Sequence, residues 1–345
     1  MKVVYSDKHS LHAPDKIVVR GMIVGNMEMP DRADQLVAAV RDAGHDLVEP
    51  RDFGRAEVAA VHTADYLVFL ETAWDRWQLL GQGGRAPTTV YSHTGPTHRM
   101  HALPTSIQGQ VGYFLSGGSA PVDKGTWEAS LASAHVALEA AEAVRSGAPV
   151  AYALCRPPGH HAYADLAGGF CYLNNVAVAA NYLSRTVGRA AIIDIDVHHG
   201  NGTQGIFYDR GDVHFVSIHS DPNHCYPFYA GFADERGEGA GLGHNLNLPL
   251  PRGSGDGPYL ASIDQGLASI RNYDPKVLLV SLGFDAYQGD PQGEMAVTTE
   301  GFRAAGARIG ALGLPTVLVQ EGGYAVADLG RNLTAFFDGF QSRFK

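Results

Sequence analysis

Short apolar runs alternate with longer segments of helical periodicity through the second half of the chain. The runs are rich in Val, Ile, Leu and Ala and predict strands at 150–154, 190–197, 213–218, 277–282 and 315–320. Apolar residues recur at helical spacing in 126–145, 171–183, 300–312 and 328–340. Runs such as AAIID and VLLVSL have no polar face, so helices should cover both sides of a parallel sheet. The pattern predicts one α/β domain spanning 1–345, because no linker or repeat divides the chain.

Two long stretches show neither the strand pattern nor the helical periodicity. They are 81–110 and the glycine-rich segment 231–257. Long loops in a compact domain usually serve as lids, rims or subunit contacts, or else they are disordered. For 81–110, an insertion tolerated at the surface is an equally good interpretation of the pattern alone.

Composition and charge narrow the classes of function. The chain has 345 residues and a formal charge of −10, and its basic residues form no stripe that would hold a phosphate backbone. We therefore expect no nucleic-acid partner, and the negative field favours a small cationic substrate. No apolar run approaches a membrane span or a signal sequence, and three scattered cysteines give no disulfide framework, so we expect a cytoplasmic protein.

Acidic and imidazole side chains alternate at the end of one predicted strand. In the segment IIDIDVHHGNG, the side chains of Asp194, Asp196 and His198 should share one face of the strand. Buried carboxylates need compensation, and oxygen plus nitrogen donors suit zinc, iron(II) or manganese. Asp285 follows the strand 277–282 and should reach the same sheet edge. The alternatives are a hydrogen-bonded acidic loop without metal and, for Asp285 alone, a turn or a helix cap.

Two adjacent histidines, His160 and His161, follow a strand in the motif RPPGHH. Beside a metal-bound water, such a pair could supply a proton acceptor and a proton donor. Asp194 could orient one imidazole, and Asn201 the other. Tyr324 follows a strand through a double glycine and could donate its hydroxyl to an oxyanion. A lone histidine or tyrosine would more often be structural, so this hypothesis depends on all the strand ends meeting.

The motifs together resemble the arginase/deacetylase superfamily, and specifically zinc-dependent, histone-deacetylase-like amidohydrolases. They are RPPGHHA, GGFCYLNN, DIDVHHGNGTQ, VSIH, SLGFDA and EGGY, in this order from about Tyr5 to Tyr324. Within the superfamily the chain most resembles bacterial acetylpolyamine amidohydrolases. The resemblance implies an eight-stranded parallel sheet between helices, an insertion at about 81–110 that narrows the site entrance, and a homodimer built through that insertion.

The resemblance also implies roles for individual residues. Zinc would be held by Asp196, His198 and Asp285, with iron(II) as an alternative. His160 and His161 would be the catalytic pair with His161 as the base, and Tyr324 would polarise the substrate carbonyl. The remaining implied residues line the channel (Gly169, Phe170, Tyr226) or hold a structural K⁺ or Na⁺ ion (Asp194, Asp196, His198, Ser217, Ile218).

Two departures from relatives bear on activity and substrate. Asn201 replaces the Asp of eukaryotic class I enzymes, as it does in polyamine and class II relatives. Gln108 and Ser119 align with acidic residues that a polyamine relative carries near its channel mouth. We therefore expect metal-activated water attack on short acetylated diamines, such as acetylputrescine or acetylcadaverine, rather than on long polycations.

Three other functions fit parts of the pattern. A protein acetyl-lysine deacetylase would use the same site, although an insertion at the mouth disfavours bulky substrates. A non-catalytic sensor of acetylated amines would not need every catalytic position filled. A dimanganese ureohydrolase of the arginase type would need more clustered ligands. The motifs HExxH, GxSxG and GxxxxGK[ST] are absent, which disfavours zincins, serine hydrolases and P-loop proteins.

Overall fold

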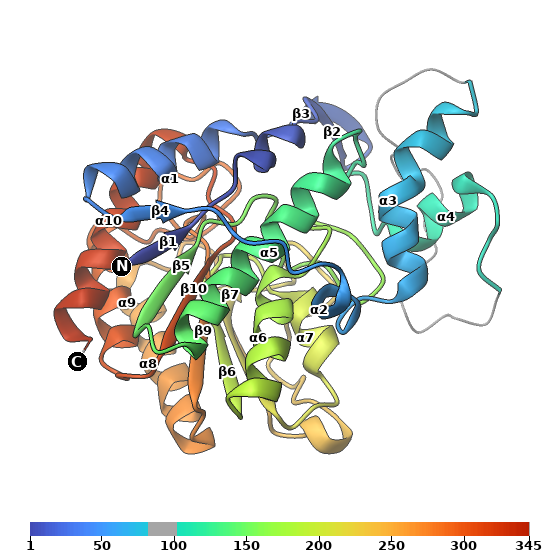
Figure 1. The fold of residues 1–345 in the computed structure, drawn as a ribbon. Coiled ribbons are helices and arrows are strands. Elements are labelled where there is room, and N and C mark those ends of the chain that lie inside the picture. Colours follow the sequence, from blue (N-terminus) through green and yellow to red (C-terminus); the bar gives the residue numbers. More distant parts are fainter. Residues whose placement is uncertain (82–101, 345) are drawn as a thin grey trace.

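A parallel sheet runs through the centre of the computed structural model, which describes residues 1–81 and 102–344 (Figure 1). Its eight strands lie in the order β4 (Asp46–Val48), β1 (Lys2–Val4), β5 (Val150–Ala153), β10 (Thr316–Gln320), β9 (Val277–Leu282), β6 (Ala190–Asp194), β7 (Val213–Ser220) and β8 (Asn245–Leu250). Every pair of neighbours is parallel. All the carboxyl ends therefore meet at one edge, and the predicted sheet is confirmed.

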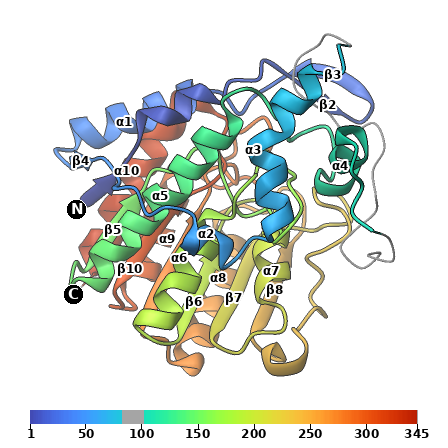
Figure 2. The ribbon, with the colours of Figure 1, turned by 45° about the vertical axis from the view of Figure 1, so that its right-hand side comes forward.

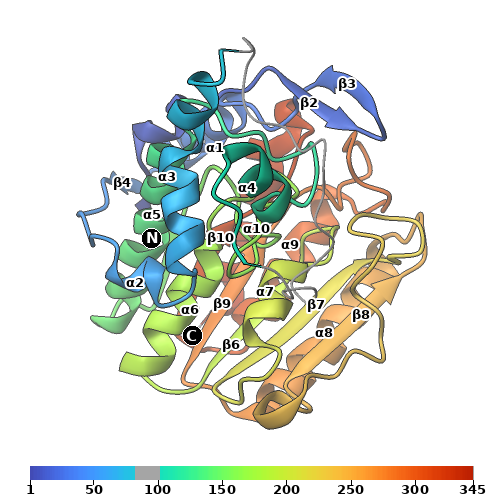
Figure 3. The same ribbon diagram turned by 90° about the vertical axis from the view of Figure 1, so that its right-hand side faces the viewer.

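Helices cover both faces of the sheet, as the lack of a polar face predicted (Figures 1 and 3). One face packs against α1 (Asp31–Asp42), α8 (Asp256–Tyr273), α9 (Thr299–Gly310) and α10 (Val326–Arg343). The other packs against α5 (Thr126–Arg145), α6 (Asn175–Thr186) and α7 (Asn201–Phe207). Successive residues of β6 serve opposite cores, because Ile193 packs in the first and Ile192 in the second.

A third group of elements lies outside α5 and α6 (Figure 2). The helices α3 (Ala64–Gln78) and α4 (Ile107–Phe114) share an apolar cluster with Leu138 of α5 and Val178 of α6. The remaining elements are α2 (Ala56–Ala59), the hairpin β2 (Lys16–Val19) and β3 (Met22–Gly25), and two short 3₁₀ helices, η1 (Asp7–Leu11) and η3 (Gly239–Gly241). None of the helices in the described ranges is long and apolar enough to cross a membrane.

Most of the insertion expected at about 81–110 falls on 82–101, which lies outside the described residues. The described remainder includes the start of α4, where the Ser106 hydroxyl accepts a hydrogen bond from the Gly109 amide. The homodimer expected through the insertion stays a prediction.

Besides small shifts at the ends of other elements, three features differ from the sequence prediction. The strand predicted at 190–197 ends at Asp194, because Asp194 Oδ1 accepts the Asp196 amide and Asp196 Oδ1 accepts the His198 amide, and these local bonds turn the chain out of the sheet. The helix predicted from 171 begins at Asn175, capped by Asn174. The segment 231–257 is not wholly irregular, since it contains β8, a proline-bearing edge strand.

Candidate active site

Four neighbouring strands deliver the predicted site residues to one edge of the sheet. The strands β5, β10, β9 and β6 are adjacent, and the motifs RPPGHH, EGGY, GFDA and IDVHH follow them in that order, each within three residues of the strand end. The register is nearly level, since Asp194 pairs with Ser281 and Gln320 with Leu282. The loops therefore start at similar heights, and their side chains meet above the same strands.

Asp196, His198 and Asp285 come together as the sequence predicted. Nδ1 of His198 lies 3.1 Å from Oδ1 of Asp196 and 3.2 Å from Oδ2 of Asp285. The three ligand atoms lie within 4.8 Å of one another, and all three side chains are largely buried. The two carboxylates come from loops that are far apart in the sequence, so the sheet brings them together.

The environment of this trio favours a cation. Burial and the neighbouring Asp196 carboxylate raise the pKa of Asp285 to about 7, although His198 opposes them. A Cβ atom at Gly283 would lie 2.1 Å from Asp196 Oδ2, and one at Gly322 would lie 2.1 Å from Asp285 Oδ2. Glycine is thus required beside both carboxylates. Two carboxylate oxygens and one imidazole nitrogen are a donor set that fits zinc or iron(II).

The two adjacent histidines have different partners. His160 donates from Nδ1 to Asp194 Oδ2 over 2.9 Å, and His161 donates from Nδ1 to Asn201 Oδ1 over 2.7 Å. Burial disfavours the His160 imidazolium, but the carboxylates of Asp194 and Asp196 outweigh it and raise the pKa of His160 to about 10. Burial and the charges of His160 and His198 instead lower the pKa of His161 well below 6.5. One histidine of the pair is therefore cationic and the other is a neutral acceptor at Nε2.

Tyr324 is buried beside the ring of Phe170 at a centroid distance of 5.6 Å. Burial raises the pKa of Tyr324 well above 10, although the Arg32 guanidinium opposes it. The phenol thus keeps its proton and can donate a hydrogen bond.

Gly169 and Phe170 form a tight turn at the predicted channel. Both have positive φ, +54° and +67°, and the Cys171 amide donates to the Gly168 carbonyl across the turn. A Cβ atom at Gly169 would lie 2.3 Å from the His161 ring, so this position requires glycine. Tyr226 packs edge-on against His161 at 4.8 Å. Gly169 and Tyr226 thus lie against the His161 ring, and the lining of an acyl-amine channel by these three residues stays a prediction.

The residues predicted to hold a monovalent cation also lie together. Asp194 at the end of β6 pairs in register with Ser217 of β7, and Ile218 follows it. The Ser217 hydroxyl is hydrogen-bonded to His219 over 2.8 Å. The binding of K⁺ or Na⁺ there stays a prediction.

Sequence reasoning missed a buried charged cluster behind the site. Glu28 lies between two arginines, with Oε1 2.8 Å from Arg32 and 2.9 Å from Arg156. The Arg32 guanidinium stacks over the Tyr324 ring at 4.7 Å and donates to the carbonyls of Gly323 and Glu321. Glu321 Oε2 in turn accepts the Gly159 amide at 2.7 Å. The spacing of Glu28 and Arg32 by four residues in the sequence was the only local signal.

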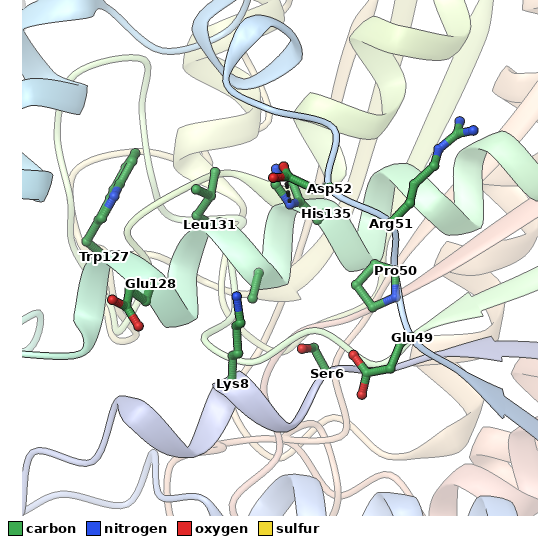
Figure 4. Close-up of a pocket in the computed structure, with 11 residues that line it drawn as sticks. Ser6, Lys8, Glu49, Pro50, Arg51, Asp52, Trp127, Glu128, Leu131 and His135 are labelled. Atoms are coloured by element: carbon green, nitrogen blue, oxygen red, sulfur yellow. Dashed lines mark ion pairs between the residues drawn. The ribbon is translucent and has the colours of Figure 1, made fainter.

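Gln108 and Ser119 align with acidic residues at the channel mouth of a polyamine relative. Gln108 is exposed on α4, and Ser119 is half-buried. A separate hollow of about 210 Å³ lies between η1 and α5, away from the metal trio (Figure 4). Both acidic and basic side chains line it, and Asp52 lies 3.7 Å from His135 there. This hollow holds none of the predicted site residues.

Comparison with known proteins matches residues 26–340 to the histone deacetylase domain. An acetylpolyamine amidohydrolase of Burkholderia pseudomallei is 48% identical over 342 residues, which cover 99% of this chain and 98% of that protein. Acetylpolyamine amidohydrolase 1 of Pseudomonas aeruginosa is 44% identical over 346 residues, 99% of each chain. A crystal structure of the acetylpolyamine aminohydrolase from Burkholderia pseudomallei superposes with a TM-score of 0.93 at 48% identity and covers 99% of both chains.

Proposed function

Because the chain belongs to the histone deacetylase family, whose members hydrolyse amide bonds, we propose that it removes the acetyl group from small acetylated amines with the help of a bound zinc ion. The observation that carries this proposal is the meeting of a buried Asp–His–Asp trio, a histidine pair and a protonated phenol at one sheet edge. The names of two full-length relatives support acetylpolyamines as the substrate class.

Asp196, His198 and Asp285 would hold the metal. A bound zinc ion would supply a Lewis acid for the acetyl carbonyl and would lower the pKa of a water molecule. Iron(II) would fit the same oxygen and nitrogen donors. Asp194, with Ser217 and Ile218 beside it, would hold the structural monovalent cation.

The protein residues then handle the protons. His161 is neutral, and its one ring proton lies on Nδ1, which donates to Asn201, so its Nε2 carries no proton. Nε2 can therefore take the proton of the attacking water and pass it to the leaving amine. Tyr324 donates a hydrogen bond from its hydroxyl group to the carbonyl oxygen as negative charge develops there. His160, whose pKa is raised by Asp194 and Asp196, would add positive charge beside the His161 ring, at a centroid distance of 4.0 Å.

The substrate we propose is short. Gly169, Phe170 and Tyr226 would line the acyl-amine channel, where the aromatic rings would pack against the methylene groups of the substrate. Gln108 and Ser119 bring no charge to the positions where a polyamine relative has acids, which favours acetylputrescine or acetylcadaverine over long polycations. A protein acetyl-lysine deacetylase remains the second candidate, because it would use the same trio and phenol.

A turnover panel on metal-defined enzyme tests the proposal. The purified apoprotein is loaded with zinc or iron(II) and given acetylputrescine, acetylcadaverine, acetylspermidine and an acetyl-lysine peptide at equal concentrations. We expect the highest kcat/KM with the two short diamines. A preference for the peptide would favour the second candidate, and no release of acetate from any of the four would contradict an amidohydrolase function.

A further inference from the structure

The backbone that carries Tyr324 is held by a carboxylate from another strand's loop. Oδ2 of Asp290 accepts the Tyr324 amide at 2.6 Å and the Ala325 amide at 2.9 Å. Asp290 is itself buried, with 8% of its surface exposed. Two hydrogen bonds to one charged oxygen, away from water, are strong and directional, so they fix the peptide on which the phenol is mounted.

Asp290 is equally well anchored to the loop that bears the metal ligand Asp285. Its Oδ1 accepts the Gln292 amide at 2.9 Å, and its own amide donates to the Tyr287 carbonyl at 2.9 Å. The loop returns close to its start, because a Cβ atom at Gly293 would lie 1.8 Å from the Asp285 carbonyl oxygen. A short, tightly folded segment therefore links Asp285 to the carboxylate that holds Tyr324.

The position also suits the helix that follows Tyr324. The helix α10 begins at Val326 after Ala325, whose methyl side chain cannot accept a hydrogen bond from the first turn. A carboxylate is favourable beside the free amides at a helix N-terminus. Asp290 places a carboxylate just before this N-terminus, where it accepts the amides of Tyr324 and of the N-cap residue Ala325 rather than those of the first turn.

We propose that Asp290 is a positioning residue for Tyr324 and sets the distance between the phenol and the metal trio. The kinetic consequence of this inference rests on the proposed function. A hydroxyl donor must lie within a few tenths of an ångström of its ideal position to hydrogen-bond the developing oxyanion. Arg32 contacts the face of the Tyr324 ring, whereas Asp290 fixes its backbone, so the two contacts restrain the side chain from different directions.

A double-mutant cycle tests this role. Asp290→Asn and Asp290→Ala are made in the wild type and in Tyr324→Phe, and kcat and KM are measured with acetylcadaverine. In the wild-type background we expect kcat to fall roughly 10- to 100-fold for Asp290→Ala with KM changed less than about threefold, since a misplacement near 1 Å costs about 10² in rate. In the Tyr324→Phe background, the same substitution should lower kcat by less than about threefold, because the hydroxyl that Asp290 positions is already gone. Equal losses in both backgrounds would overturn the inference.

Asp52→Asn is the matched control. Like Asp290, Asp52 accepts a hydrogen bond from the amide two residues later in the sequence, here that of Gly54 at 2.7 Å. Asp52, however, is exposed and is not among the predicted site residues. It should leave kcat unchanged. Metal content is measured for every variant, and loss of metal in proportion to the loss of kcat would assign Asp290 to the trio instead.

Hydrogen exchange separates this inference from the proposed function. The Tyr324 and Ala325 amides should exchange about tenfold faster or more in Asp290→Asn. Both amides donate to the buried Asp290 side chain, and an asparagine would accept their hydrogen bonds more weakly. This result does not depend on turnover. Unchanged exchange would refute the role of Asp290, whereas faster exchange in a protein that hydrolyses none of the acetylated amines would refute only the proposed activity.

Discussion

His161 donates a hydrogen bond from Nδ1 to the amide oxygen of Asn201 across 2.7 Å, so the proposed base is paired with a neutral group. Its neighbour His160 faces the Asp194 carboxylate instead. Burial lowers the pKa of His161, whereas the carboxylates of Asp194 and Asp196 raise the pKa of His160, so the different partners separate two adjacent imidazoles.

Asn201→Asp should make His161 more basic. A carboxylate beside Nδ1 favours the imidazolium, and carboxylate partners typically shift a pKa by about 1 to 3 units. Because the proposed base works unprotonated, the acidic limb of the kcat/KM profile should move to higher pH. The measurement is kcat/KM for acetylcadaverine from pH 5 to pH 9, and a limb that stays in place or moves to lower pH would argue against His161 as the base.

Tyr324→Phe should keep the fold and the bound metal while losing most of the turnover. Removing one donor from an oxyanion site costs on the order of 10²–10³ in rate. Steady-state kcat, metal content and the melting temperature are measured together. Turnover at the wild-type rate would exclude the assigned role of the phenol.

Removal of the metal should abolish activity and destabilise the fold. The Asp196 and Asp285 carboxylates are buried side by side, and a ligand that binds only the folded state adds about 2.7 kcal/mol of stability at 100 times its Kd. Chelated enzyme should therefore melt at a lower temperature, and added zinc should restore both properties. A melting temperature that is the same with and without zinc would show that the trio does not bind the ion.

Glu28→Gln should destabilise the protein strongly. The fully buried carboxylate lies between Arg32 and Arg156, and removing one partner from a buried ion pair typically costs about 3–5 kcal/mol. The control is Glu300→Gln. Glu300 pairs with Arg303 on the surface, so this substitution should lower the free energy of unfolding by less than about 1 kcal/mol. Urea unfolding at pH 7 compares the two variants, and equal losses would show that the buried cluster is not a source of stability.

Buried neutral histidines should make the fold sensitive to mild acid. Burial lowers the pKa of His12 to about 3 and that of His62 to about 4. Below pH 6.5 the unfolded chain binds protons at these residues and the folded chain does not, so each removes about 1.4 kcal/mol of stability per pH unit until its folded pKa is reached. Above pH 6.5 the effect vanishes. Urea unfolding at pH 7 and pH 5 measures the slope, which should be smaller in His62→Gln; an unchanged slope would rule His62 out.

The residues of the metal trio and the histidine pair were predictable because each follows an apolar run in its own short motif. A parallel sheet brings the carboxyl ends of its strands to one edge, so the strand pattern and the sheet type predicted that Asp196, Asp285 and His161 lie at that edge. The strand order, which places β5, β10, β9 and β6 side by side, brings them together there. The three-residue strands β1 and β4 gave no such signal, because a run of three apolar or mixed residues occurs in any element.

The sequence by itself determined the two faces of the sheet, the ligand types and their placement at strand ends, because alternation and residue chemistry are local properties. Only the tertiary structure decided which side chains restrain those ligands. Asp290 meets the Tyr324 amide 34 residues away, and Arg32 meets the Gly323 carbonyl across 291 residues. Such contacts depend on how loops from different strands fold against one another, and no periodicity or motif in the chain records that arrangement.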